Sequence, residues 1–253
     1  MMDALKRSGF ILLLLNTCFY QTLLAQIKTP KYEIAMAAGF SNYMGDLTPS
    51  LAGSFKGLKP SIAIAGMKLL SNYLGIRGQL LLSKLNHHDA WYQTPAYKPL
   101  RNFNFTSSLS EFSITGVYTI SGANFETYDQ PKFNPYITAG IAVAKTNITR
   151  NWSQTNPAFL SLKVDNAQNL AKDNATTPPR WIFALPFGVG IRTALHPQWS
   201  LTLEGQYRLL FTDYLDGFSY AANPKENDGY YTIQLGIIYR WSNSGSVKCP
   251  RKL

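Results

Sequence analysis

The stretch that decides the fold is WSLTLEGQYRLLFTD, residues 199–213, and a second stretch, GYYTIQLGIIYRW at residues 229–241, repeats its pattern. In both, apolar and polar residues alternate with a period of two, which is typical of a β-strand with two different faces. In the first stretch the apolar set is Leu201, Leu203, Tyr207, Leu209 and Phe211, and the polar set is Thr202, Glu204, Gln206, Arg208 and Thr212. The pattern predicts two long strands.

The same alternation recurs along the chain and predicts eight strands. The predicted segments are 31–41, 59–70, 74–86, 108–120, 133–148, 181–195, 199–213 and 229–241. Each segment reaches the roughly 9–11 residues that a tilted membrane strand needs. No stretch of 18 apolar residues follows the N-terminal region, so the sequence predicts no membrane-spanning helix.

The direction of burial follows from the composition of the two faces. The set opposite the large apolar residues consists mostly of Gly, Ala, Ser and Thr, which suit the crowded inside of an eight-stranded barrel. Charged residues make up only 15% of the chain, below the roughly 25% of soluble domains. The sequence therefore predicts an all-β fold: an eight-stranded antiparallel transmembrane outer-membrane β-barrel, with apolar side chains outside and polar side chains inside.

The connections between the predicted strands alternate in length. The segments 71–73 and 196–198 are short, whereas 42–58, 87–107, 149–180 and 214–228 are long, and 121–132 is intermediate. Bacterial outer-membrane barrels have short periplasmic turns and long extracellular loops. We therefore expect the long loops outside the cell and both chain ends in the periplasm.

The N-terminus has the features of a secretory signal peptide. Lys6 and Arg7 precede an apolar run from Phe10, and Ala25 is a small residue suited to cleavage. The expected division is a signal peptide at 1–25, a barrel at 26–241 and a periplasmic tail at 242–253, in the outer membrane after export. A lipoprotein role for Cys18 is the weaker alternative, because Asn16 and Thr17 are poor leading residues.

Two further features exclude classes of function. Removal of residues 1–25 leaves Cys249 alone, so the mature chain has no intramolecular disulfide or cysteine cluster. The formal net charge of +10 comes from scattered Lys and Arg residues with no run of five or more. Nucleic-acid-binding proteins cluster their cations, so we expect outer-membrane lipid and no nucleic acid as a partner.

Seven charged residues belong to the inward-facing set. Unpaired charges are costly inside a narrow, filled barrel, so these residues predict a structural network of ion pairs, with a proton or ion path as the alternative. The set is Glu33, Arg77, Glu111, Arg192, Glu204, Arg208 and Arg240. Glu33 and Arg240 should meet where the first and last strands close the barrel.

Other candidate chemistry is weaker. His87 and His88 stand at the end of a predicted strand, where a lipid-modifying barrel enzyme would keep a catalytic histidine, but adjacent strand residues point to opposite faces. Asp46, Asp213 and Asp216 could gather calcium, but the loops lack EF-hand spacing; hydrogen bonds to loop backbone are the simpler expectation. The sequence predicts no catalytic residue, no cofactor and no metal site.

Five segments of the chain carry recognisable motifs: YEIAMAAGFSNYMGDL at 32–47, FNPY at 133–136, PFGVGIR at 186–192, Tyr207-Arg208 and TDYLDG at 212–217. Together these segments resemble a family of Bacteroidota outer-membrane barrels that includes PorG of the type IX secretion system. Its motif residues are Asn42, Tyr43, Gly45, Asp46, Asp213, Tyr214, Leu215 and Asp216. The resemblance implies a non-enzymatic barrel that contacts periplasmic lipoprotein and ring subunits of a protein secretion complex, and it brings no catalytic residues.

Three hypotheses of function follow. The first is a structural component of a secretion apparatus, held by its periplasmic face. The second is a general small barrel that stabilises the envelope or binds apolar ligands. The third is a lipid-modifying enzyme that uses His87 or His88.

Overall fold

The computed structural model describes residues 31–48, 54–122, 133–196, 198–223 and 227–242. The expected signal peptide and nearly all of the expected tail lie outside these ranges. The described residues form eight strands: β1 (Lys31–Met44), β2 (Lys59–Leu69), β3 (Leu74–His88), β4 (Asn104–Thr119), β5 (Asn134–Asn151), β6 (Trp181–His196), β7 (Trp199–Leu210) and β8 (Gly229–Ser242).

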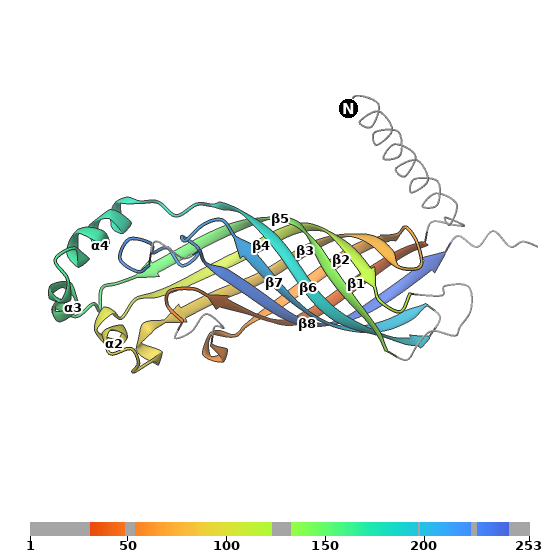
Figure 1. Cartoon of the computed structure of the whole chain (residues 1–253), viewed down its shortest axis with the longest axis horizontal. Coiled ribbons are helices and arrows are strands. Elements are labelled where there is room, and N and C mark those ends of the chain that lie inside the picture. Colours follow the sequence, from red (N-terminus) through yellow and green to blue (C-terminus); the bar gives the residue numbers. More distant parts are fainter. Residues whose placement is uncertain (1–30, 49–53, 123–132, 197, 224–226, 243–253) are drawn as a thin grey trace, which may run out of the picture.

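The strands close into one barrel in sequence order (Figure 1). Every neighbouring pair is antiparallel, and β1 pairs with β8 to complete the closure. In that last pair Glu33 lies opposite Arg240, as the sequence predicted. The predicted fold class and strand count are confirmed.

The outside of the barrel carries a belt of apolar side chains. On β3 the outward residues Ile76, Leu80 and Leu82 are about half exposed, and their counterparts on β5 include Ile137 and Ile141. This apolar belt spans residues 74–82 of β3 and 135–143 of β5, close to the roughly 9–11 residues of a membrane strand. Within the described ranges, none of the helices has the length and apolar character that crossing a membrane requires.

The alternation inverts beyond the apolar belt, which the sequence reading missed. On β3, Leu85 faces inward and is fully buried, whereas its neighbour Lys84 is exposed. On β4, Phe105 and Leu109 are buried, whereas Thr106 and Ser108, which lie between them in the sequence, are exposed. This outer part of the wall has the faces of a water-soluble barrel, apolar inside and polar outside. The prediction of polar side chains inside therefore holds only at the level of the apolar belt.

The inversion also explains the differences in strand length. β4 starts at Asn104 instead of 108, β3 continues to His88, and β5 continues to Asn151, because the strands extend past the apolar belt into segments that looked like polar loops. The three strands remain paired along this extension, from Leu85–Ser107 to His88–Asn104 and from Ser107–Ile148 to Asn104–Asn151. They form a wall that projects beyond the apolar belt.

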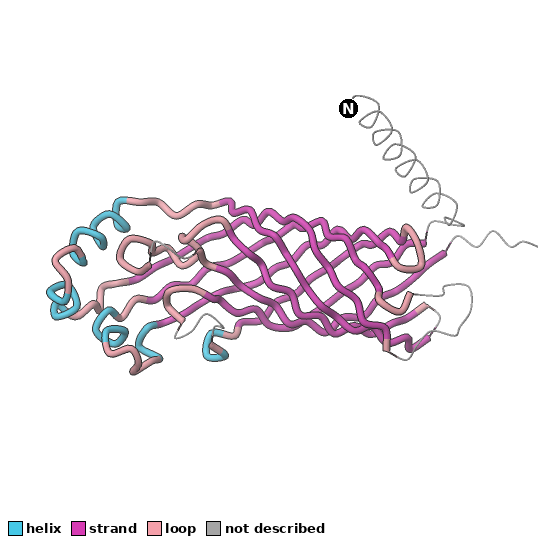
Figure 2. The backbone as a smooth tube through the Cα atoms, in the orientation of Figure 1, coloured by secondary structure: helices cyan, strands magenta, loops and turns pink. Residues whose placement is uncertain are grey.

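The connections separate into two ends (Figures 1 and 2). At the turn end, the short connections β2–β3 and β6–β7 join their strands, next to the start of β1 and the end of β8. At the loop end, the long connections carry the helices. These are η1 (Phe55–Gly57), η2 (Asp89–Trp91), α2 (Tyr97–Arg101), α3 (Pro157–Leu162) and α4 (Asn166–Ala175).

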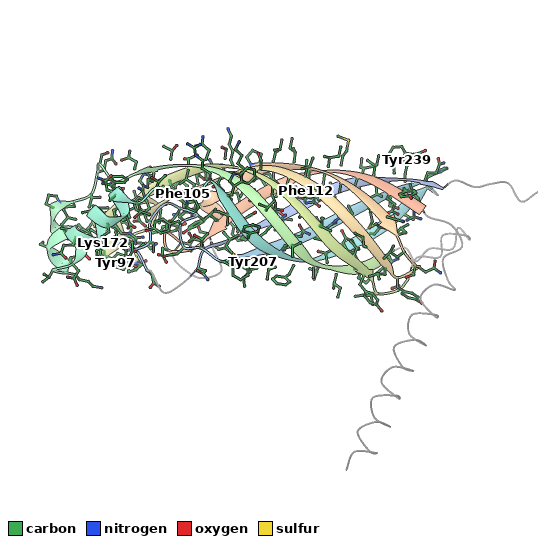
Figure 3. The ribbon with its side chains drawn as sticks, turned by 90° about the horizontal axis from the view of Figure 1, so that it is seen from above. Tyr97, Phe105, Phe112, Lys172, Tyr207 and Tyr239 are labelled. Carbon is green, nitrogen blue, oxygen red and sulfur yellow. The ribbon has the colours of Figure 1, made fainter. Side chains whose placement is uncertain are left out.

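Aromatic residues lie at both ends of the barrel. Tyr239 lies at the turn end, where its ring is 4.9 Å from that of Trp199, whereas Tyr97 lies among the helices of the loop end (Figure 3). Aromatic side chains favour the level of lipid headgroups, but Tyr43 and Tyr214, which lie near the loop-end edge of the apolar belt, do not face lipid. Because β1 continues to Met44, Tyr43 falls on the inward set and is fully buried. Tyr214 is half-buried in the loop that follows β7.

Candidate functional site

The seven inward charges predicted from the sequence all lie inside the barrel and meet in three groups. Near the turn end, Glu33 accepts hydrogen bonds from Arg192, at 3.1 and 3.0 Å, and from Arg240 Nε, at 2.7 Å. Next along the barrel, Arg77 and Glu204 form a bidentate pair of 2.6 and 3.0 Å. Paired charges with bidentate geometry are the arrangement that a narrow, low-dielectric interior tolerates.

The third group contains Arg208, which has no exposed surface. Its guanidinium lies 3.2 Å from Glu111, donates at 2.6 Å to the hydroxyl of Thr232 and at 2.9 Å to Oε1 of Gln206. The hydroxyl of Tyr230 donates to the same Glu111 carboxylate. The buried charge is therefore surrounded by acceptors, and it closes the barrel at the level where the apolar interior begins.

These groups fill the barrel instead of lining a channel. Beside them lies a cavity of about 40 Å³, bordered by Ala35, Ala37, Ala63 and Ala65 together with Gln79. Nε2 of Gln79 is buried without a protein partner. A cavity of this size has room for about one water molecule, and not for a lipid chain or a drug-sized ligand.

At the loop end, the two halves of the family motif come together. Tyr43 on β1 donates a hydrogen bond toward Asp216 Oδ2 at 2.7 Å, and its hydroxyl is also 2.7 Å from Asp228 Oδ1. Asp228 in turn accepts from the backbone N–H of Leu215, at 2.9 Å. Gly45 packs against this group so closely that an added Cβ would lie 2.0 Å from the Asp228 carboxylate. A glycine is required there.

The contact between Tyr43 and the two aspartates requires a shared proton. A phenol hydroxyl has one hydrogen and can donate to one carboxylate only, so the second carboxyl must itself carry a proton. Burial raises the pKa of Asp228 to about 7, and burial together with the charge of Asp228 raises the pKa of Asp216 well above its usual range. Asp216 also accepts from Phe218 N at 2.8 Å, as expected for a loop-stabilising aspartate.

The remaining motif residues also hold loop backbone, with one exception. Asn42 donates to Ser54 O at 2.8 Å and to the hydroxyl of Tyr231 at 2.9 Å. Asp46 accepts from Asn223 N at 2.6 Å. Asp213 is different, because its buried carboxylate holds no backbone group of the described chain. Burial raises its pKa to about 8, although a hydrogen bond with the side chain of Ser219 lowers it. Among the described residues no group of His, Cys, Asp and Glu has the arrangement of a metal site.

A second charged group of the loop end was missed by the sequence reading. Asp89, which starts η2, accepts from Arg101 at 2.6 and 2.9 Å, and both residues are buried. Lys98, one turn earlier on α2, donates to three successive backbone oxygens of the β1–β2 loop, those of Asp46, Leu47 and Thr48, at 2.7–3.1 Å. A short basic segment in a long loop gives no local pattern from which such tertiary contacts could be predicted.

Asp173 on α4 forms a third group and was also missed. Its carboxylate accepts from three successive backbone N–H groups, those of Ser219, Tyr220 and Ala221, at 2.8–3.2 Å. Tyr214 of the family motif donates its hydroxyl to the same carboxylate at 3.2 Å. Asp173 thus joins the β5–β6 loop to the β7–β8 loop, and α4 is positioned by it.

The two histidines point to opposite faces, as expected. His87 faces inward and is almost fully buried; its Nε2 lies 2.9 Å from the hydroxyl of Tyr92. His88 is half-exposed, and its Nδ1 accepts from Ala90 N at 3.1 Å to cap η2. Within the described chain, the hydrogen bonds of His87 include neither a serine hydroxyl nor a carboxylate, so no nucleophile, base and orienting acid converge here.

A closed eight-stranded antiparallel barrel with an apolar exterior and a filled, ion-paired interior is the fold class of small outer-membrane β-barrel proteins. The chain belongs to the family described as a domain of unknown function (DUF6089), whose model matches residues 8–245. None of the curated proteins matches the sequence.

Solved structures with a similar fold include several outer-membrane proteins. Ail, the attachment invasion locus protein of Yersinia pestis, is 12% identical and aligns over 84% of this chain and 99% of its own, with a TM-score of 0.45. Neisserial surface protein A is 14% identical over 83% and 97%, with a TM-score of 0.44. A major outer membrane protein of Thermus thermophilus is 13% identical over 84% and 99%, also with a TM-score of 0.44.

Proposed function

We propose that this chain is a non-enzymatic protein of the bacterial outer membrane, with its loop end outside the cell and its turn end in the periplasm. The apolar belt supports the membrane location, because a closed barrel leaves no unpaired strand edge and meets lipid with apolar side chains. The polar wall beyond the belt, with exposed Lys84 and Ser108, supports the placement of the loop end in water.

The non-enzymatic assignment rests on one observation: the motif residues are engaged in contacts that hold the loops. Tyr43, Asp216 and the backbone of Leu215 are buried in contacts with one another and with Asp228. Asn42 and Tyr214 bond loop groups in the same way. Contacts that hold the loops to the barrel are a sufficient reason for these motif residues to occur together, and no substrate is needed to explain them.

The finer proposal is a structural part of the type IX protein secretion machinery in a Bacteroidota cell, similar to PorG. The turn end would then contact a periplasmic ring and its lipoprotein. The sequence resemblance supports this role, and the filled barrel agrees with a scaffold function in place of solute conduction. The expected tail, 242–253, starts at the same end, after Arg240 and Trp241.

Site-specific photo-crosslinking in cells tests this role. A photoreactive residue is placed at Asn72, which is exposed in the β2–β3 turn, and separately at Val164, which is 92% exposed at the loop end. We expect crosslinks to periplasmic lipoprotein or ring subunits from Asn72 and none from Val164. A deletion strain should fail to secrete type IX cargo, and the wild-type gene should restore secretion.

Two outcomes would contradict the secretion role. Normal cargo secretion by the deletion strain, with no crosslinked ring subunit, would leave a general envelope barrel as the function. Altered lipid composition in the same strain, restored by wild-type protein but not by His87→Ala, would support the lipid-modifying enzyme. The small size of the barrel cavity, about 40 Å³, makes an apolar ligand inside the barrel the weaker form of the general hypothesis.

A further inference from the structure

Among the residues that the structure describes, the exposed charges are almost all positive. Among the described residues, Asp165 is the only exposed carboxylate, and the others are buried or half-buried in the interior and the loop-end groups. The exposed cations are Lys56, Lys68, Lys84, Lys145, Lys163, Lys172 and Arg180. Only Lys68 of this set lies toward the turn end, so the exposed charges that the structure describes at the loop end are positive except for Asp165.

Two of these cations stand on the outer face of the projecting wall, directly beyond the apolar belt. Lys84 on β3 is paired with Ser108 of β4, and Lys145 on β5 is paired with Ser110 of β4. The two lysines therefore flank β4 with two exposed serines between them. Since neighbouring strands lie about 4.8 Å apart and the two lysines are offset by two residues along β4, their backbones are roughly 12 Å apart. Extended lysine side chains can converge over that gap.

The surroundings of this pair have one apolar side and one polar side. Leu82, Phe112 and Val143 are the next outward residues of the three strands on the side of the apolar belt. Trp181 of β6 is paired with Lys145, with the ammonium 5.9 Å from the ring centroid. Trp is favoured at the level of lipid headgroups. Farther from the belt, exposed Asn147 lies opposite Ser108.

The main chain places a third cation beside the pair. Thr146 donates its backbone N–H to the carbonyl of Arg180 at 2.9 Å, so Arg180 lies next to Lys145, and its side chain is exposed. Neither Lys84, Lys145 nor Arg180 forms an ion pair with any residue that the structure describes. The described residues therefore supply no counter-ion for these three charges.

We propose that Lys84, Lys145 and Arg180, with the hydroxyls of Ser108 and Ser110, bind the phosphate groups of a phosphorylated glycolipid of the outer leaflet. The acyl chains of this lipid would lie along the apolar belt below Leu82 and Phe112. The site depends on the proposed outer-membrane location, because only there does the belt edge meet headgroups. It does not depend on a role in secretion.

The chemistry of the site fits this ligand. Cations near a membrane surface attract anionic headgroups by about 1 kcal/mol each, which is about a fivefold change in affinity per cation. The hydroxyl and amide groups beside the lysines supply further hydrogen bonds to phosphate or sugar oxygens. A free phosphate ion would find the same cations but would gain nothing from the apolar belt.

Native mass spectrometry of the full-length protein in detergent tests the site, with bisphosphorylated lipid A as the probe. The test variant is Lys84→Ala with Lys145→Ala, and the matched control is Lys68→Ala with Lys163→Ala, which removes two exposed lysines elsewhere. We expect the test variant to bind lipid A at least tenfold more weakly, and the control to bind within twofold of wild type. Heat-dependent gel mobility shows that each variant is folded.

Two comparisons identify what is bound. Lipid A without phosphates should bind wild type about as weakly as bisphosphorylated lipid A binds the test variant, and millimolar inorganic phosphate should not displace the lipid. Unchanged binding by the folded test variant, or equal binding of dephosphorylated lipid A, would overturn the proposal. Full displacement by inorganic phosphate would also overturn it, in favour of a site for free phosphate. None of these outcomes depends on cargo secretion.

Discussion

Tyr43 and Asp216 lie 173 positions apart in the sequence, and a hydrogen bond of 2.7 Å joins them inside the loop end of the barrel. Asp228 shares the same hydroxyl, so one phenol connects the end of β1 to both ends of the β7–β8 loop. This contact explains how the long loops of the protein hold one arrangement above the barrel. The loop end is organised by buried polar groups as much as by the apolar cluster around them.

Removal of the Tyr43 hydroxyl should loosen the loops and spare the barrel. We expect Tyr43→Phe to cost about 1–3 kcal/mol, because it removes the donor that two buried carboxyls share. Protease cleavage in the β7–β8 loop should become faster, while heat-dependent gel mobility stays as in wild type. Tyr118→Phe, on the exposed outer face, is the control and should change neither. Equal protection of both variants would show that the shared hydroxyl does not stabilise the loop.

The loop end should be more stable in mild acid than in base. Opening of the loop into water returns Asp228 and Asp213 to a pKa of about 4, whereas in the folded loop burial raises these pKa values to about 7 and about 8. Between these limits the folded form binds more protons than the open form, so the stability present at pH 4 is lost as pH rises through 7 and 8.

Hydrogen exchange of residues 211–223 measures this effect. After correction for the intrinsic pH dependence of exchange, protection should be higher at pH 5.5 than at pH 8.5. Asp228→Asn should show a smaller difference between the two pH values, because it removes one of the titrating groups. Protection that rises with pH would mean that these carboxyls are ionised in the folded loop.

The two faces of β7 should respond very differently to substitution. Leu203 is 52% exposed on the outer face at the level of the apolar belt. Leu203→Arg should therefore destabilise the protein by roughly 2–4 kcal/mol in a lipid-vesicle refolding titration. Thr202→Ala loses the 2.6 Å hydrogen bond to Tyr136 and should cost about 1 kcal/mol. Equal costs would place the lipid face one residue out of register.

Loss of the Glu33 carboxylate alone should destabilise the barrel more than replacement of a whole ion pair elsewhere in it. Glu33→Gln removes the negative charge between two buried guanidiniums, Arg192 and Arg240, and should cost about 3–5 kcal/mol. Replacement of the whole Arg77–Glu204 pair, by Arg77→Met with Glu204→Leu, should be close to neutral or stabilising, because no charge is left alone. The two variants are compared by the denaturant concentration at which each is half unfolded. A larger loss for the double replacement would contradict this ranking.

The barrel could be predicted from the sequence because its signal is local. Each strand at membrane level alternates large apolar with small or polar residues, and the lipid and the narrow interior impose that alternation directly. Glu33 and Arg240 could be matched in advance because closure of an even number of strands places the ends of the first and last side by side. The inward charges could be named for the same reason.

The loop end could not be predicted because its contacts are tertiary. Around Lys84 and Leu85 the period of two continues, but the polar residues now face outward and the apolar residues inward. A search for strands with apolar outer faces therefore ends at this point and assigns the rest to a polar loop. Asp173 and Lys98 carry no pattern in their own segments, since their partners are backbone groups of other loops. The exchange of faces at Lys84 is the signal from which the longer strands could have been predicted.

The central claim is that the barrel sits in the outer membrane with its loop end outside, and cysteine labelling on intact cells tests it most directly. In a background with Cys18→Ser and Cys249→Ser, Val164→Cys and Asn72→Cys are exposed separately to a membrane-impermeant maleimide. We predict that Val164→Cys is labelled on intact cells and that Asn72→Cys is labelled only after the outer membrane is permeabilised. Labelling of Asn72→Cys on intact cells, with protection of Val164→Cys, would contradict the account.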